Sequence, residues 1–218
     1  MQLITRTLMI MLLACTATSA SYAAPEDAQT MVHQTSDRMI AALKAERATI
    51  KANPARLYSL VEEIVLPHFD FERMSSWVLG KHWRTASDAQ RVRFVQEFRA
   101  LLVRIYATAM AEYRDQEIAY LPLKAATGAD EVTVRSEIRN PGGPSIPVSY
   151  SAYLKNNEWK VYDVIIDGVS MVVNYRSTFS NEIKQGGLDA LIDKLAALNL
   201  KKINDTTLSV NLNNAAAR

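Results

Sequence analysis

The chain has 218 residues, of which 49% are hydrophobic and 22% are charged, and this balance argues for a globular protein and against overall disorder. Its length allows one sizeable domain or two small lobes. A formal net charge of +2 is nearly neutral and gives no support for a nucleic-acid-binding protein. The single cysteine excludes a disulfide framework within the chain.

The first 23 residues have the pattern of a secretion signal. Met1–Thr7 carries Arg6 and no acid, Leu8–Ala14 is an unbroken apolar run, and small residues follow. Ser21-Tyr22-Ala23 has small side chains at the two positions that signal peptidase reads, which predicts cleavage after Ala23. The run is too short for a membrane anchor, which needs roughly 20 apolar residues.

Cys15 offers an alternative reading of the same segment. Lipidation of this residue would tether the mature protein, but Leu12-Leu13-Ala14-Cys15 is a poor lipoprotein box because Leu13 is bulky. Cleavage after Ala23 would instead remove the only thiol with the signal.

Helical spacing of apolar residues and helix-end signals predict four helices before residue 114. Pro25 with two following acids starts the first, Pro67 ends the second, Gly80 closes the third, and Ser87 is the expected N-cap of the fourth. The predicted ranges are 25–47, 54–66, 69–79 and 88–113.

The middle of the chain changes to the alternation of β-strands. Strands are predicted at 117–121, 132–139, 148–154 and 159–166, joined by short turns such as Asn140–Pro144 and Asn156-Asn157. Three or four strands with such turns form an antiparallel meander.

The strand at 159–166 is apolar on both expected faces. Val161 and Ile165 would lie on one face, and Tyr162, Val164 and Ile166 on the other. A strand of this kind needs apolar cover on both sides. The cover is either helices on both sides, or a helix layer on one side and a ligand cavity on the other.

Asp167-Gly168 is a predicted turn into a helix at 169–184, which Gly186-Gly187 breaks before a last helix at 188–198. Residues 199–218 are rich in Asn and end in Ala-Ala-Ala-Arg, which predicts a flexible C-terminal tail. The expected organisation is therefore one domain at 24–198 between the signal and the tail.

No pattern in the chain predicts catalysis or metal binding. The pair His68 and Asp70 resembles a metal motif, but its spacing suits a strand and the segment is expected to be a loop entering a helix. Gly168–Val172 lacks the second glycine of a nucleophile elbow, so Ser170 is a helix-start residue.

Asp163 is the best candidate for an acid or base, since a carboxylate in the middle of a strand is costly unless it is paired. Small isomerases with a curved sheet use an inward Asp to abstract protons. A structural ion pair with Arg176, one helix later, is the favoured interpretation.

Two signatures resemble the MlaC family, also called toluene-tolerance auxiliary proteins. The first is Leu66–Phe71, Met74 and 77–83, followed by the helix 86–106. The second is Trp159–Val164, followed by 168–170, 174–176 and Phe179. The resemblance covers roughly residues 28–198, nearly the whole mature chain.

The resemblance implies an α+β fold in which helices pack on a curved antiparallel sheet of about four strands and enclose a hydrophobic lipid cavity. It also implies a soluble, monomeric periplasmic shuttle of Gram-negative bacteria, with phospholipid as cargo, no cofactor and no catalytic residue. Its expected partners are the outer-membrane lipoprotein MlaA with a porin and the MlaD ring of an inner-membrane transporter. The expected function is to carry glycerophospholipids and maintain outer-membrane lipid asymmetry.

The expected lipid contacts come from one face of the sheet and from the helices opposite it. They are Val148, Tyr150, Ala152, Val164 and Ile166 from the strands, and Tyr106, Met110, Met171, Val172 and Tyr175 from the helices. A change of register by one residue would exchange the strand set for its opposite.

The third and fourth helices also carry a basic stretch, which is either a solvated helix face or a surface for headgroups or acidic partners. It comprises Arg73, Lys81, Arg84, Arg91, Arg93 and Arg99.

Three other functions are consistent with the same residues. The chain would be a carrier of another amphiphile such as a hopanoid, an isomerase-like enzyme with Asp163 as base, or a binder of unfolded outer-membrane proteins. Lipid extracted in stoichiometric amount would distinguish a carrier from a chaperone, and its identity would name the cargo.

Overall fold

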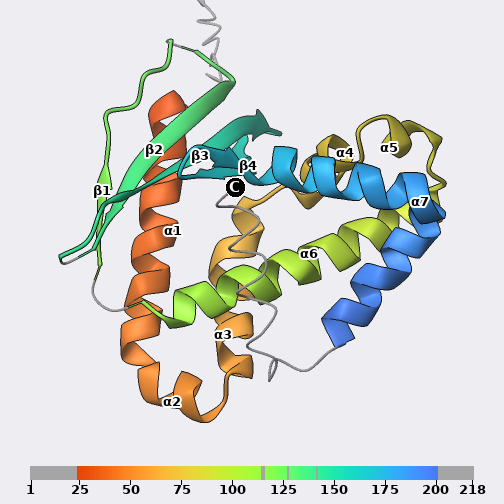
Figure 1. Cartoon of the computed structure of the whole chain (residues 1–218). Coiled ribbons are helices and arrows are strands. Elements are labelled where there is room, and N and C mark those ends of the chain that lie inside the picture. Colours follow the sequence, from red (N-terminus) through yellow and green to blue (C-terminus); the bar gives the residue numbers. More distant parts are fainter. Residues whose placement is uncertain (1–23, 114–115, 127, 141, 201–218) are drawn as a thin grey trace, which may run out of the picture.

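The computed structural model describes residues 24–200, except for positions 114, 115, 127 and 141. The predicted signal peptide with Cys15 and all but the first two residues of the predicted tail lie outside this range. A curved antiparallel sheet forms one layer, and the helices form the other and extend beyond one end of the sheet (Figure 1). The predicted α+β class is confirmed.

The first half of the chain is helical, as its sequence predicts. The elements are α1 (Pro25–Ala45), α2 (Arg47–Ala52), α3 (Ala55–Leu60), the π-helical turn η1 (Val61–Val65), the 3-10 turn η2 (Leu66–His68), α4 (Phe71–Leu79), α5 (Lys81–Thr85) and α6 (Asp88–Ala111).

The predicted helix ends have identifiable causes in the structure. Ser87 caps α6, because its side chain accepts the Gln90 N–H while the Gln90 side chain accepts the Ser87 N–H. The third helix begins at Phe71, two residues later than predicted, because Asp70 is its N-cap. Gly80 ends that helix with a φ of 54°, a conformation that favours glycine.

The sheet is a meander of five strands in the order β1-β2-β3-β4-β5. The strands are β1 (Glu117–Tyr120), β2 (Glu131–Arg139), β3 (Ile146–Lys155), β4 (Glu158–Ile166) and β5 (Val169–Ser170). The four predicted strands are confirmed. The two residues of β5 were predicted to be helical, but they pair with the end of β4 before α7 (Met171–Leu200) begins.

A register shift in β4 changes which side chains share a face. Val161 pairs with Ala152 and Asp163 pairs with Ser151, so Tyr162 is an extra residue without a partner of its own. Such a bulge places two neighbouring residues on the same side. Val161 therefore lies on the same face as Val164 and not with Ile165, which corrects the strict alternation expected from the sequence.

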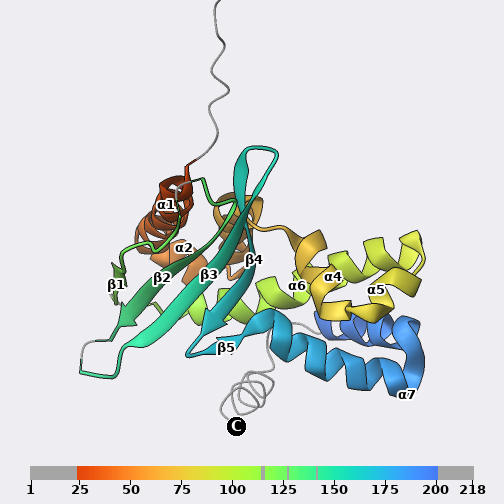
Figure 2. The ribbon, with the colours of Figure 1, turned by 90° about the horizontal axis from the view of Figure 1, so that it is seen from above.

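The last helix bends where the glycine pair predicted a break. Gly187 has φ 82° and ψ 173°, so the helical path of α7 is interrupted there and continues in a new direction to Leu200 (Figure 2). The helix thus extends two residues beyond the predicted domain end at 198. No helix in the described part of the chain is long and apolar enough to cross a membrane.

Two hydrophobic clusters hold these elements together. The larger one joins the inner face of the sheet, together with Tyr153 and Tyr162 from the outer face, to α1, α4, α6 and α7. The smaller one joins α1, α3, η1 and α6. In Figure 1 the sheet lies across α1 and above α6, so its inner face looks onto the helices.

Candidate functional site

The inner face of the sheet carries all five strand residues that were predicted to contact lipid. Val148 pairs with Ile166 and Tyr150 pairs with Val164, and residues that pair directly across an antiparallel ladder share a face. Ala152 follows Tyr150 by two residues along β3 and so points the same way. Together they form a continuous, mainly apolar surface across β3 and β4.

The helix residues of the predicted set lie opposite this surface, with one exception. Met171, Val172 and Tyr175 are buried in the first turns of α7 and belong to the larger cluster, and Tyr106 of α6 packs against it. Met110, one turn farther along α6, packs in the smaller cluster instead. The structure thus brings nine of the ten predicted residues into one apolar interior.

Aromatic rings fill the contact between α6 and α7, and the predicted set of lipid contacts missed three of them, Phe94, Phe98 and Phe179. Phe94 and Phe98 are completely buried, and the Phe98 ring lies 5.2 Å from that of Tyr175. Phe179 lies 5.3 Å from Tyr175 and 5.9 Å from Phe94. The four-residue spacing of Phe94 and Phe98 was the available signal, because it places both rings on one helix face.

The polar groups of this interior are hydroxyls. Burial raises the pKa of Tyr150 to about 12 and also raises the pKa of Tyr175 and of Tyr106, the last with a contribution from Asp163. The Ser136 hydroxyl donates to the Val148 carbonyl at 3.1 Å. The phenols therefore stay neutral at physiological pH, and the surface facing the helices offers hydroxyl groups within apolar surroundings.

Asp163 has a structural role, but its partner differs from the predicted one. Its carboxylate accepts hydrogen bonds from the Ser170 hydroxyl at 2.5 Å and from the Val172 N–H at 3.0 Å. No ion pair joins it to Arg176 among the described residues; that guanidinium lies against Gly80. Asp163 is therefore an acceptor at the start of α7, where a helix has unpaired N–H groups and a positive end.

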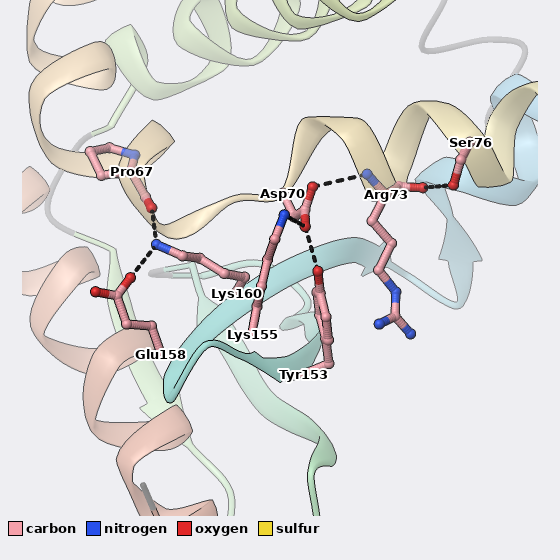
Figure 3. Close-up of polar contacts among 8 residues, drawn as sticks. All are labelled: Pro67, Asp70, Arg73, Ser76, Tyr153, Lys155, Glu158 and Lys160. Atoms are coloured by element: carbon pink, nitrogen blue, oxygen red, sulfur yellow. Dashed lines mark hydrogen bonds and ion pairs between the residues drawn. The ribbon is translucent and has the colours of Figure 1, made fainter. Parts of the chain in front are cut away.

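A second polar group ties the helices to the sheet on its outer side (Figure 3). The Asp70 carboxylate accepts the Arg73 N–H at 2.9 Å, the Lys155 ammonium at 2.7 Å, and the Tyr153 hydroxyl. The Asp70 N–H donates to the Val161 carbonyl at 2.9 Å, next to a parallel bridge between Phe69 and Val161. We call Asp70, Tyr153 and Lys155 the Asp70 tie.

The electrostatics of the Asp70 tie favour the ionised carboxylate. Burial by itself would raise the pKa of Asp70, but hydrogen bonds from the Arg73 N–H, Lys155 and Tyr153 outweigh it and hold the pKa below its ordinary value. Next to the tie, Lys160 donates to the Pro67 carbonyl at 3.0 Å (Figure 3). The segment 68–70, which contains His68 and Asp70, therefore connects η2 to α4 and is hydrogen-bonded to the β3–β4 hairpin.

Above the outer face of the sheet, Arg73 stacks on aromatic rings. Its guanidinium carbon lies 3.8 Å from the ring centroid of Tyr153 and 4.3 Å from that of Tyr162, and an Nη atom lies 3.2 Å from Glu131. The indole of Trp77 lies 5.2 Å from the Tyr162 ring. Sequence reasoning missed this stack, because the bulge that turns Tyr162 outward has no signature in the pattern of apolar residues.

A groove of about 550 Å³ opens on the side of α6 that faces away from the sheet. Its lining comes from α3, η1, α6 and the end of α7, and includes Tyr58, Val95, Val103 and Leu200. It contains none of the ten predicted lipid contacts. Across the described residues, no group of three or more His, Cys, Asp and Glu side chains is placed to hold a metal ion.

Comparison with known proteins decides the family. The sequence profile described as "MlaC protein" matches residues 33–197. The chain belongs to the MlaC family. The resemblance noted from the two signatures is thereby confirmed over nearly the same range.

Individual members of the MlaC family align along most of this chain. It is 29% identical to the "Intermembrane phospholipid transport system binding protein MlaC" of Haemophilus influenzae over 168 residues, which cover 76% of this chain and 78% of the relative. It is also 29% identical to the "Toluene tolerance protein ttg2D" of Pseudomonas putida over 191 residues, or 86% and 87% of the two chains.

A solved structure shares the MlaC fold. The phospholipid-binding protein from Ralstonia solanacearum, determined in complex with a phospholipid, superposes with a TM-score of 0.73 at 32% sequence identity. The match covers 79% of this chain and 96% of the solved chain. Its helices and sheet therefore correspond to those described here.

Proposed function

We propose that this member of the MlaC family is a periplasmic carrier that holds the acyl chains of glycerophospholipids between its sheet and its helices, and that it is not an enzyme. The observation that carries the proposal is the apolar interior formed by β3, β4, α6 and α7, in a chain whose relative of the same fold binds a phospholipid. The proposed partners are the outer-membrane lipoprotein MlaA with its porin, and the inner-membrane transporter, which the carrier meets through MlaD. Transport between these two partners would maintain the lipid asymmetry of the outer membrane.

Physical chemistry explains why such a lipid needs a carrier. Each methylene removed from water contributes about 0.8 kcal/mol, so releasing a diacyl lipid with roughly thirty methylenes into water would cost on the order of 20 kcal/mol. A protein offsets this cost by surrounding the chains with apolar side chains, while the polar headgroup stays in water. Binding of this kind needs no nucleophile, base or metal ion.

The proposed binding surface comprises the ten residues expected from the sequence, with Met110 at its margin in the smaller cluster. Val148, Val164 and Val172 are each 7% exposed or less, and they pack in the same cluster. An acyl chain that lies between them must therefore part the sheet from α6 and α7. The contacts that it replaces are of the same apolar kind, so the interior stays dry during the exchange.

The test is to place a charge on the proposed surface and measure the lipid that copurifies. Mature protein is purified from the periplasm, extracted with organic solvent and analysed by mass spectrometry. We expect about one phospholipid per folded parent chain and almost none for Val164→Glu or Val172→Glu, because a carboxylate cannot lie among acyl chains without a partner. Val92→Glu is the matched control, since Val92 is 58% exposed on the outer side of α6.

A buried glutamate can also unfold the chain, so lipid is measured only on folded monomer collected by gel filtration. Ile166→Trp is a second variant that fills the same face from a half-buried position without adding charge. A parent chain without lipid would contradict the carrier, and a hopanoid in the extract would change the cargo. Normal phospholipid content in Val164→Glu, Val172→Glu and Ile166→Trp would refute the proposed binding surface.

A further inference from the structure

Apart from Arg73, which pairs with Glu131 of the sheet, the basic stretch of the predicted third and fourth helices divides into two groups in the structure. Arg91, Arg93 and Arg99 each have an acidic partner, at 3.3 Å from Asp88, 2.6 Å from Asp193 and 3.5 Å from Glu62 respectively. These three cations are neutralised on the surface of α6.

Other cations gather around the turn between α4 and α5 without an acid. Lys81 and Arg84 are exposed on α5, and Arg176 is exposed on α7. A Cβ atom at Gly80 would lie only 3.1 Å from an Nη atom of Arg176, which places that guanidinium at the turn. Within the part of the chain that the structure describes, none of the three forms an ion pair. The turn therefore carries an uncompensated positive charge.

An exposed tryptophan lies one helical turn before this charge. Trp77 is 47% exposed although α4 buries Met74, Val78 and Leu79. Its ring packs against the tilted ring of Tyr162, with the two centroids 5.2 Å apart, and its indole N–H has no hydrogen-bond partner among the described residues. A rigid indole with a free N–H beside unpaired cations is typical of a surface that meets the boundary between water and lipid, where tryptophan and basic residues are enriched.

We propose that Trp77, Lys81, Arg84 and Arg176 form a contact site for an anionic phospholipid membrane surface. The cations would meet lipid phosphates, and the indole would enter the headgroup layer. The site lies at the end of the molecule that is far from α2 (Figures 1 and 2), so one end of the protein can touch a bilayer. This binding to a membrane surface is separate from the binding of a lipid molecule between the sheet and the helices.

Vesicle flotation of the mature protein tests the site. The vesicles are phosphatidylethanolamine with phosphatidylglycerol at a 3:1 ratio, and pure phosphatidylcholine serves as the neutral comparison. We expect the parent to float with the anionic vesicles, less at high salt, and not with the neutral ones. Each basic residue near an anionic surface raises the affinity for that surface about fivefold. The double variant with Lys81→Ala and Arg84→Ala should therefore bind the anionic vesicles about 25-fold more weakly than the parent.

The tryptophan gives an independent signal. The chain has three tryptophans, of which Trp159 is buried and Trp83 is partly buried, so a blue shift of emission on vesicle binding reports Trp77. We expect Trp77→Phe to abolish most of this shift. Trp77→Ala should weaken binding about tenfold, if about 50 Å² of the ring enters the headgroup layer.

Two controls separate this site from general charge and from the proposed carrier. Arg47→Ala with Lys51→Ala removes the same charge from α2, where both residues are exposed, and should leave flotation unchanged. Val164→Glu should bind vesicles like the parent even if it holds no lipid. Failure of the parent to float with anionic vesicles, or an equal loss in the α2 variant, would overturn the membrane site and point to a protein partner or to a solvated face.

Discussion

The contribution of the Asp70 tie to stability can be tested directly, because one carboxylate accepts hydrogen bonds from three donors in the two layers of the fold. Asp70 is 6% exposed, and its side chain accepts the Arg73 N–H at the start of α4 together with Tyr153 and Lys155 from β3. Asp70→Asn removes the charge but keeps a side chain that caps helices well. Asp70→Ala removes both, so the two variants separate the charge from the cap.

The expected magnitudes follow from these contacts. Hydrogen bonds to charged groups contribute about 1.5–3 kcal/mol, and Asp70→Asn should cost about 1.5 kcal/mol because the remaining amide still accepts one bond. Loss of an N-cap adds about 1 kcal/mol, so Asp70→Ala should cost about 2.5 kcal/mol. With a denaturant slope of about 2 kcal/mol per molar, the midpoints in urea fall by about 0.75 M and 1.25 M.

The assay is urea unfolding of the chain from residue 24 onward, followed by circular dichroism at pH 7 and at acidic pH. The folded-state pKa of Asp70 lies below its ordinary value of 3.8, so its charge contributes stability above that value and loses it as the pH falls through the folded pKa. The difference between parent and Asp70→Asn should therefore be constant from pH 7 to about pH 5 and shrink below pH 4.

Asp88→Asn is the matched control for Asp70, since Asp88 is also at a helix start but has a side chain that is 98% exposed. It should leave the urea midpoint unchanged. Equal midpoints for the parent and Asp70→Ala would refute the tie. A difference between parent and Asp70→Asn that stays constant down to pH 2 would refute its electrostatic part.

Two further positions test the turn between α4 and α5 and the start of α7. Gly80→Ala should lower the free energy of unfolding by about 1–2 kcal/mol, because φ is 54° and the new Cβ would press on Arg176. Gly142→Ala is the control, since Gly142 also has a positive φ but open space around it. It should lower the free energy of unfolding by less in the same thermal unfolding experiment. Asp163→Ala should lower the free energy of unfolding by about 2 kcal/mol, because the buried Val172 N–H loses its acceptor. Asp163→Asn should keep most of the stability, because its amide oxygen can still accept that N–H. Equal thermal midpoints for the two variants would contradict the capping role.

Local signals in the sequence predicted the elements well. Ser87 with Gln90 three residues later is a capping box, and it begins α6 where expected. Asn156-Asn157 takes positive φ values of 51° and 63° in the turn between β3 and β4, which asparagine tolerates. Such features depend on residues close in the chain, so they are readable before the fold is known.

The parts that could not be predicted depend on contacts between distant segments. The extra residue Tyr162 shifts the register of β4 against β3, and no property of the strand itself marks the place. Asp70 pairs with a lysine 85 positions away, which no local pattern indicates. The sequence indicated that Asp163 is a buried carboxylate that needs a partner, and Arg176 was the expected partner. In the structure the backbone N–H of Val172 donates to this carboxylate instead.

The bulge also separates two roles along one strand. Val161, Val164 and Ile166 lie on the inner face of the sheet, while Tyr162 lies on the outer face and packs against Arg73 of α4. The proposed carrier must exchange inner contacts between its own side chains and lipid chains without unfolding. Apolar contacts are suited to this, because they have no fixed direction and one apolar partner can replace another. Directional contacts, such as those of Asp70 and the Arg73 stack, lie on the outer side, where cargo does not disturb them. It follows that outer substitutions should lower stability with little effect on lipid content, whereas inner substitutions such as Val164→Glu should remove the lipid even from the molecules that stay folded.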